Sequence, residues 1–150
     1  MTVNDLRIQR MGISEVATIA KMERCGFTTP WREEELKESL SDEVTVFWVA
    51  LLEDKIVGYI SRTHSFETMD ILTLYVLKEF RRNGIAAKLL AYLEQEARQK
   101  GVEKIFLEVR ESNTAARKLY ENNGYILIHK RARYYNNPTE DALILQKEIG

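Results

Sequence analysis

Apolar residues along the chain follow two periods, and these periods predict most of its secondary structure. Runs rich in β-branched and aromatic residues, often alternating with polar ones, indicate strands. Seven segments show this pattern: 3–10, 44–52, 56–63, 69–76, 104–110, 125–133 and 142–148. Short polar turns separate the second from the third and the sixth from the seventh. Both of these pairs are therefore expected to form hairpins.

Helical spacing of apolar residues predicts four helices. The clearest apolar stripe consists of Ile85, Leu89, Leu90, Leu93 and Ala97. The helix that carries it is expected to end at Gly101. The other helices are expected over 15–24, 31–40 and 113–122. Ser14, Thr29 and either Ser112 or Asn113 are the expected capping residues, because their side chains accept hydrogen bonds from free N–H groups at a helix start.

The order of these elements predicts an α+β fold. Strand 104–110 follows a strand and a helix, so it should run parallel to 69–76 through a right-handed crossover. The remaining strands are joined by short turns, which favours antiparallel pairing. We therefore expect one domain over residues 1–150, with a mixed, mostly antiparallel sheet and flanking helices.

Composition narrows the class of protein. The 150 residues carry 22 basic and 23 acidic side chains, so net charge gives no reason to expect nucleic-acid binding. The single Cys25 cannot form an internal disulfide, and we expect it to be at least partly buried rather than a nucleophile. His64 and His129 lack the spacing of metal ligands. Without a signal-peptide layout or an apolar run of roughly 18 residues, a cytoplasmic protein without membrane contact is expected.

A basic, glycine-containing loop at 81–86 lies between a predicted strand and the helix that follows it. A helix N-terminus has unpaired N–H groups and partial positive charge. Gly84 lets the backbone approach a ligand closely, and Arg81 and Arg82 add charge. The loop therefore predicts an anion site, most naturally for phosphate or pyrophosphate. A solvated connection is the alternative that the loop alone leaves open.

Three polar side chains are expected beside this loop. Glu108 lies near the end of strand 104–110, and Asn113 and Tyr120 are two helical turns apart on one helix face. The carboxyl ends of adjacent parallel strands are a common ligand site, so one cleft is predicted here. Each residue also has a purely structural interpretation: Glu108 as a surface residue, Asn113 as a cap, and Tyr120 as part of the core.

The motif RxxGxA at 81–86 resembles the signature of the GNAT superfamily of N-acetyltransferases, and it stands in the required strand-to-helix context. The sequence LEVRESNTAARKLYENNGY at 107–125 more closely resembles the RimI-type protein N-terminal acetyltransferases. Two shorter likenesses are PW at 30–31 and RYY at 133–135, the latter followed by an acidic pair. The resemblance covers nearly the whole chain and implies a GNAT fold, in which the parallel strands splay apart.

The resemblance also implies acetyl-CoA as co-substrate and a role for each site residue. Glu108 would be the general base, and Tyr120 the general acid that protonates the leaving thiolate. A backbone N–H near Val76 is the candidate donor to the acetyl oxygen. The implied acetyl-CoA contacts are Leu74, Tyr75, Val76, Arg81, Arg82, Asn83, Gly84, Ile85, Ala86, Ala87 and Asn113. The implied acceptor contacts are Phe27, Tyr134 and Tyr135, although Phe27 and Trp31 could equally be core residues.

The implied acceptor is a protein N-terminus, with a ribosomal protein as one candidate. An α-amine has a pKa of about 8 against about 10.4 for lysine, so its deprotonation near neutral pH costs less. Acetylation of a lysine or of a small-molecule amine is the alternative activity. A CoA-binding subunit without turnover is a further alternative, against which the presence of Glu108 and Tyr120 argues. Asp70 stands where some eukaryotic relatives carry an aromatic residue, which leaves the acceptor open.

Overall fold

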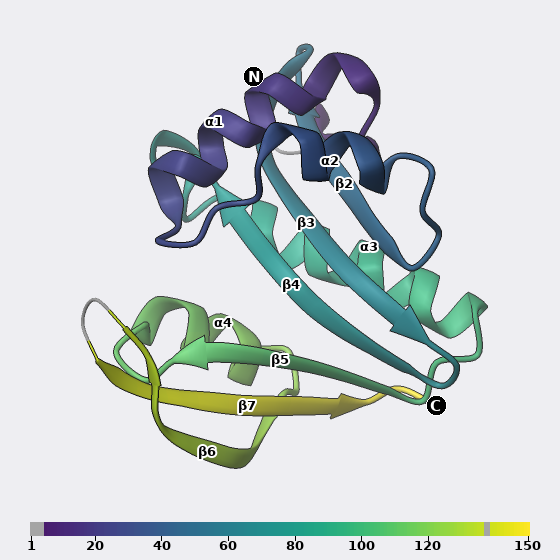
Figure 1. Ribbon diagram of the computed structural model, residues 1–150. Helices are drawn as coiled ribbons and strands as arrows, with labels where there is room; N and C mark the ends of the chain where they lie inside the picture. Colours follow the sequence, from purple (N-terminus) through teal and green to yellow (C-terminus); the bar gives the residue numbers. More distant parts are fainter. Residues whose placement is uncertain (1–4, 137–138) are drawn as a thin grey trace.

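The computed structural model describes residues 5–136 and 139–150 (Figure 1). Its strands are β1 (Arg7–Arg10), β2 (Thr45–Leu52), β3 (Lys55–Ser65), β4 (Thr68–Val76), β5 (Lys104–Arg110), β6 (Ile126–Tyr135) and β7 (Glu140–Glu148). Its α-helices are α1 (Val16–Gly26), α2 (Glu33–Ser39), α3 (Ile85–Gln99) and α4 (Thr114–Asn122). Two 3-10 turns, Ile13–Glu15 and Lys78–Phe80, precede α1 and the α3 loop.

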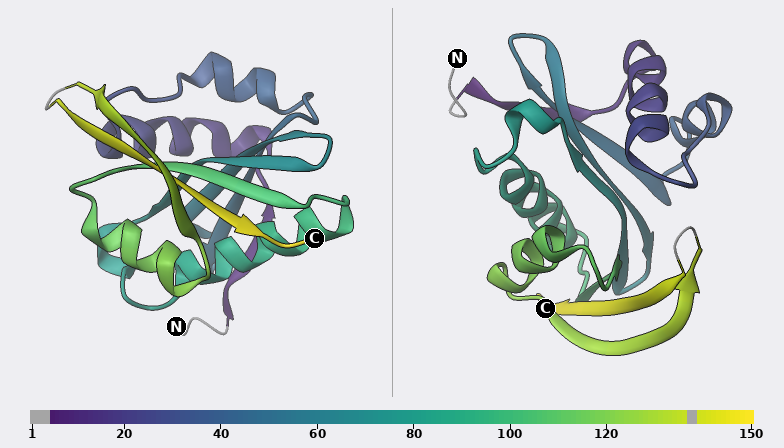
Figure 2. Two further views of the ribbon diagram at one scale, coloured as in Figure 1. Left: turned by 90° about the horizontal axis from the view of Figure 1, so that it is seen from below. Right: turned by 90° about the vertical axis from the view of Figure 1, so that its left-hand side faces the viewer.

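The strands form one sheet in the order β1-β2-β3-β4-β5-β7-β6. β4 and β5 pair in parallel, and the other neighbours pair antiparallel. Figure 2 shows α1 and α2 on one face of the sheet and α3 and α4 on the other. The predicted α+β class, the crossover through α3 and both hairpins are thereby confirmed.

Alternation along the strands builds a core on each face of the sheet. In β2, Trp48 and Ala50 pack toward α3, whereas Phe47 and Val49 pack toward α1 and α2. The predicted apolar stripe of α3 lies within the first core, and its five residues are 0–1% exposed. A sheet covered on both faces has to be apolar on both, which explains why β2 is buried over nearly its whole length.

The parallel pair is splayed, as the resemblance implied. β4 and β5 pair from Thr68 and Lys104 as far as Ile71 and Leu107. Beyond that point β4 continues to Val76 without β5 as a partner, and Figure 1 shows the two strands diverging. The backbone edge of β4 past Ile71 is therefore open to a ligand, because unpaired N–H and C=O groups there seek hydrogen bonds.

Both capping predictions in the N-terminal part are wrong. Gly12 begins the turn before α1, and its N–H donates to the Glu15 carboxylate at 2.7 Å, so Glu15 and not Ser14 provides the cap. The second helix begins at Glu33 after Arg32, whose backbone is extended, and Thr29 lies in a bend four residues before the helix. The first strand begins at Arg7, and the part of that prediction before residue 5 lies outside the described residues.

Cys25 is exposed, contrary to the expectation that it is at least partly buried. Its position near the end of α1 is on the helix face that points away from the apolar core on that side of the sheet. Within the described part of the chain, none of the helices is both long and apolar enough to cross a membrane.

Candidate active site

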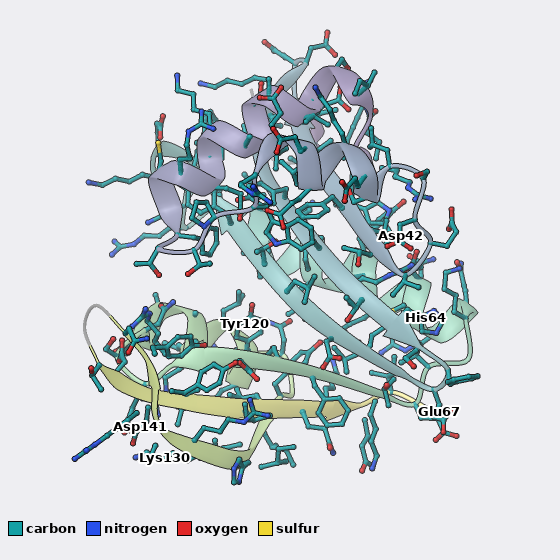
Figure 3. All side chains as sticks on the ribbon, in the orientation of Figure 1. Asp42, His64, Glu67, Tyr120, Lys130 and Asp141 are labelled. Atoms are coloured by element: carbon teal, nitrogen blue, oxygen red, sulfur yellow. The ribbon has the colours of Figure 1, made fainter. Side chains whose placement is uncertain are left out.

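A cavity of about 510 Å³ lies at the splay between β4 and β5. The segment between α1 and α2, the ends of both strands, α4 and β6 contribute to its walls. Figure 3 shows Tyr120 in the opening between β4 and β5. The predicted site residues that line this cavity are Phe27, Leu74, Glu108, Asn113, Tyr120 and Tyr135. The predicted contacts Tyr75, Val76, Tyr134 and those of the loop 81–87 are not among its lining residues.

The loop before α3 presents its backbone as predicted. Gly84 is the N-cap residue at φ 77°, in the left-handed region that favours glycine, and no side chain caps the helix there. A Cβ atom at Gly84 would meet no other atom within 4 Å, so the space above it is open. The Asn83 amide donates to the carbonyl groups of Phe80 and Arg81 at 3.1 and 3.2 Å, which braces the loop. The free N–H groups at the start of α3 suit an anion.

The two arginines of this loop differ in what they contact. Arg81 turns back, its Nε donating to the Val76 carbonyl at 2.9 Å while its guanidinium lies 5.6 Å from the centre of the Tyr75 ring. Arg82 is exposed at φ 67° and forms no hydrogen bond or ion pair with another described residue. We therefore infer that Arg81 supports the loop and the end of β4, and that Arg82 remains available for an anion.

Tyr120 reaches the cavity from the core beneath it. It is 7% exposed, and its ring packs edge-on against Tyr125 with 5.6 Å between ring centres. Burial raises the pKa of its hydroxyl, because the phenolate would be poorly solvated. The hydroxyl therefore stays protonated near neutral pH and is suited to donate a proton. Both interpretations from the sequence apply to it: a core residue with a polar end at the cavity.

Glu108 reaches the same cavity from the opposite face of the sheet. Its neighbours Leu107 and Val109 are buried beneath the sheet, so Glu108 projects to the open face, where its side chain is 36% exposed. Arg131 of β6 donates from Nη1 to its Oε1 at 3.1 Å. Sequence reasoning missed Arg131, because the basic run around it has the pattern of a solvated strand. The pairing of β6 with β7 and of β7 with β5 is what brings it near.

Asn113 is the N-cap residue of α4 and also lines the cavity. Its Oδ1 accepts a hydrogen bond from the Ala116 N–H at 3.2 Å and so caps α4. Its side chain also lines the cavity. Because the cap uses the carbonyl oxygen, the amide nitrogen remains as a donor toward the cavity.

The three predicted acceptor contacts are not equivalent. Phe27 lines the cavity, with its ring centre 5.9 Å from that of Tyr75. Tyr135 also lines it, is half-buried, and lies under the Arg110 guanidinium at 4.4 Å. Tyr134 is not among the lining residues, and its ring packs against Tyr135 and under the Arg131 guanidinium. The structure thus gathers Phe27 and Tyr135 at the cavity and leaves Tyr134 beside it.

A buried carboxylate that sequence reasoning missed links the segments around Phe27 at the edge of the cavity. Glu23 is fully buried and accepts hydrogen bonds from the Trp31 N–H at 3.0 Å and from the Tyr59 hydroxyl. These bonds join the last turn of α1 to the extended segment before α2 and to β3. Burial raises the pKa of Glu23, and the two hydrogen bonds partly oppose that rise. Its place in the apolar stripe of α1 is a signal that could have revealed it.

Glu23 should make stability depend on pH. A raised folded-state pKa means that the folded chain binds this proton more readily than the unfolded chain does. The stability from this group is therefore complete below its ordinary pKa of 4.5 and is lost as the pH rises through the folded value. We expect the free energy of unfolding of Glu23→Gln, relative to that of the wild type, to be higher at about pH 8 than at about pH 5. Urea unfolding at the two pH values measures this difference. For the exposed control Glu34→Gln, the free energy of unfolding should differ from that of the wild type by the same amount at both pH values. If Glu23→Gln also shows the same difference at both, the expectation is wrong.

No group of three histidine, cysteine, aspartate or glutamate side chains is placed to hold a metal ion among the residues that the structure describes. The cavity itself is lined by the carboxylate of Glu108, the phenol of Tyr120 and the amide of Asn113, and the free N–H groups at the start of α3 lie outside its lining. This set suits proton transfer beside an anionic ligand.

Comparison with known proteins places the chain among acetyltransferases. The sequence pattern of the acetyltransferase (GNAT) family matches residues 16–125. An uncharacterized N-acetyltransferase of Methanocaldococcus jannaschii is 31% identical over 142 residues, which cover 94% of this chain and 90% of that protein.

Two solved structures share the fold. A ribosomal-protein alanine N-acetyltransferase from Escherichia coli has a TM-score of 0.87 at 24% identity, covering 97% of this chain and 94% of that one. A GNAT family acetyltransferase from Elizabethkingia anophelis, with acetyl-CoA bound, has a TM-score of 0.78 at 19% identity. The match covers 97% of this chain and 99% of that one.

Proposed function

The chain belongs to the acetyltransferase (GNAT) family, and on this premise we propose that it acetylates the α-amine of a protein N-terminus. It is an acetyl-CoA-dependent N-acetyltransferase, and acetyl-CoA is its co-substrate. The acceptor class, the roles of individual residues, a single-domain organisation and a cytoplasmic location are parts of the proposal. The similar Escherichia coli enzyme, which acts on a ribosomal protein, supports a protein acceptor.

The residues present fit acetyl-CoA. The uncapped start of α3, the open space above Gly84 and the free guanidinium of Arg82 suit its pyrophosphate. The open edge of β4 from Leu74 to Val76 suits the amide groups of its pantetheine arm, and Asn113 offers a further donor. When bound, acetyl-CoA supplies the activated acetyl group as a thioester.

The observation that carries the proposal is that a base and an acid reach one cavity from opposite faces of the sheet. Glu108 projects from the open face, and Tyr120 projects from the core between the sheet and α4. Glu108 would accept a proton from the acceptor nitrogen, and Tyr120 would donate one to the departing thiolate. The amine and the thioester can then approach from different sides without sharing an entrance.

The geometry favours a peptide end over a small amine. Glu108 lines the cavity together with Phe27, from the segment after α1, and Tyr135, from the β6–β7 hairpin, so an extended chain can lie between these two walls. An α-amine also needs less help to lose its proton than a lysine does. Acetylation of a lysine or of a small-molecule amine remains the alternative for the test.

A pair of peptides decides between these acceptors. One has a free α-amine and no lysine, and the other has a blocked α-amine and one lysine. Incubation with labelled acetyl-CoA should label the first at least about tenfold faster at neutral pH, as expected from the two amine pKa values. Equal labelling of both would overturn the α-amine assignment, and labelling of neither at any pH would point to a small-molecule amine as the acceptor.

Loss of the Arg82 guanidinium should weaken acetyl-CoA binding. Arg82→Ala removes a charged donor to phosphate, so the KM for acetyl-CoA should rise by about tenfold with little change in kcat. Arg98→Ala, at the other end of α3, is the matched control and should change neither. A rise in the KM for the acceptor peptide alone would contradict the proposed phosphate contact.

A further inference from the structure

A second cavity of about 650 Å³ adjoins the first along the open face of the sheet. The two cavities share five lining residues: Ile71, Leu72, Leu107, Glu108 and Tyr135. The second adds Asp70 of β4, Thr63 of β3 and Arg131 of β6. The reaction cavity therefore continues into a groove that contains another carboxylate, to which neither the family match nor the sequence assigned a role.

Asp70 and Glu108 face the same groove from neighbouring strands. Met69 and Ile71 are buried beneath the sheet, so Asp70 between them projects to the open face, as Glu108 does on β5. Asp70 pairs with Phe106, two residues before Glu108 on the parallel strand. Both side chains line the second cavity, and they lie close enough for the negative charge of Glu108 to act on Asp70. A small group held between the two side chains can contact both carboxylates.

The two carboxylates differ in their partners. Glu108 is held by Arg131 at 3.1 Å, whereas Asp70 forms no hydrogen bond or ion pair with another described residue. Desolvation by the groove walls raises the pKa of Asp70, and the negative charge of Glu108 raises it further. The other ionisable groups lining the groove are Arg131 and Tyr135, while β3 contributes the uncharged Thr63. Asp70 thus holds a proton more readily than a fully solvated aspartate does.

Acetylation of an amine that arrives as an ammonium ion releases two protons from its nitrogen. The first must leave before the nitrogen lone pair can attack. The second leaves as the N–C bond forms, and the C–S bond of the thioester then breaks. The thiolate takes one proton, through Tyr120, and the other goes to solvent. A single carboxylate can accept both protons only if it releases the first to solvent before it accepts the second.

We propose that Asp70 accepts the first proton, from the acceptor's ammonium group, and that Glu108 accepts the second as the N–C bond forms. Asp70 then releases its proton to water along the groove. Glu108 returns its proton through water to Tyr120, which has protonated the thiolate, so the sum is one amide, one free thiol and one proton. This inference rests on the proposed function, because it concerns the same acceptor amine.

The test is the pH dependence of Asp70→Asn with the free α-amine peptide. At about pH 7 its kcat/KM should fall by at least about tenfold, because the ammonium ion has lost its proton acceptor. At about pH 9 the loss should shrink to about twofold or less, because an α-amine with a pKa of about 8 is already neutral there. Glu67→Gln, an exposed carboxylate that lines neither cavity, is the matched control and should follow the wild type throughout.

The outcomes separate this inference from the proposed function. If Asp70→Asn loses the same factor at both pH values, or loses nothing, Asp70 does not accept the proton. Acetyl-CoA binding by the variant, measured by calorimetry, should equal that of the wild type, and weakened binding would equally overturn the assignment. If the wild type labels only the lysine peptide, the α-amine assignment fails. The same comparison is then made with that peptide, for which recovery requires a pH nearer 10.4.

Discussion

Replacing Glu108 by glutamine is expected to lower kcat by about 10²- to 10³-fold and to leave acetyl-CoA affinity unchanged. Glutamine keeps the shape of the side chain and can still accept a hydrogen bond from Arg131, so the groove should keep its form. It cannot take up a proton, however, and the nitrogen would have to release its second proton to water. Because Glu108 lies on the face opposite Tyr120 and the α3 loop, the acetyl-CoA contacts should be untouched.

Steady-state rates with the free α-amine peptide and calorimetry with acetyl-CoA measure the two parts of this expectation. Glu111→Gln is the matched control, because Glu111 follows the same strand, is partly exposed and pairs with Lys130 outside the cavity. An unchanged kcat in Glu108→Gln would remove Glu108 as a base. A parallel loss of acetyl-CoA affinity would show instead that the substitution disturbs the whole site.

Replacing Tyr120 by phenylalanine is the second large effect, with an expected loss of about 10²-fold in kcat. Burial holds the pKa of this hydroxyl above its ordinary value, so the group is protonated when the thiolate leaves. Phenylalanine preserves the edge-on contact with Tyr125, and no other described residue forms a hydrogen bond with the lost hydroxyl. The fold should therefore survive, while departure of the thiolate loses its proton donor.

Thermal unfolding and single-turnover rates separate catalysis from stability for this variant. Tyr92→Phe is the matched control, because Tyr92 lies on α3 against Trp48, is 38% exposed and lines neither cavity. An acetyl thioester with a better leaving thiol should recover much of the lost rate in Tyr120→Phe. If the loss is the same with both thioesters, Tyr120 is not the proton donor.

Local patterns predicted the parts of the site that lie on one element or its end. Gly84 was identifiable because a left-handed residue before a helix calls for glycine. Asn113 was identifiable as a cap, and the spacing to Tyr120 placed both on one helix face. The alternation in strand 104–110 correctly turned Glu108 away from the core. Each of these conclusions depends only on residues within a few positions of one another.

The residues that were missed or misplaced depend on contacts between distant segments. Glu23 was missed because its partners, Trp31 and Tyr59, lie 8 and 36 positions away. The same contact engages the Trp31 N–H outside α2, which begins two residues later than predicted. Arg131 joins Glu108 across 23 positions through two strand pairings. No periodic pattern within one element records such contacts.

The sequence by itself determined the α+β class, the glycine before α3 and the family resemblance that pointed to acetyl-CoA, and it predicted anion binding at that loop. These follow from local backbone preferences and from the periodicity of apolar residues, which act over one or two turns or strands. Only the tertiary structure decided which charged groups share the groove. Asp70, Glu108 and Arg131 come from three strands, and their electrostatic relation depends on strand order, register and burial, which exist only after the sheet has assembled.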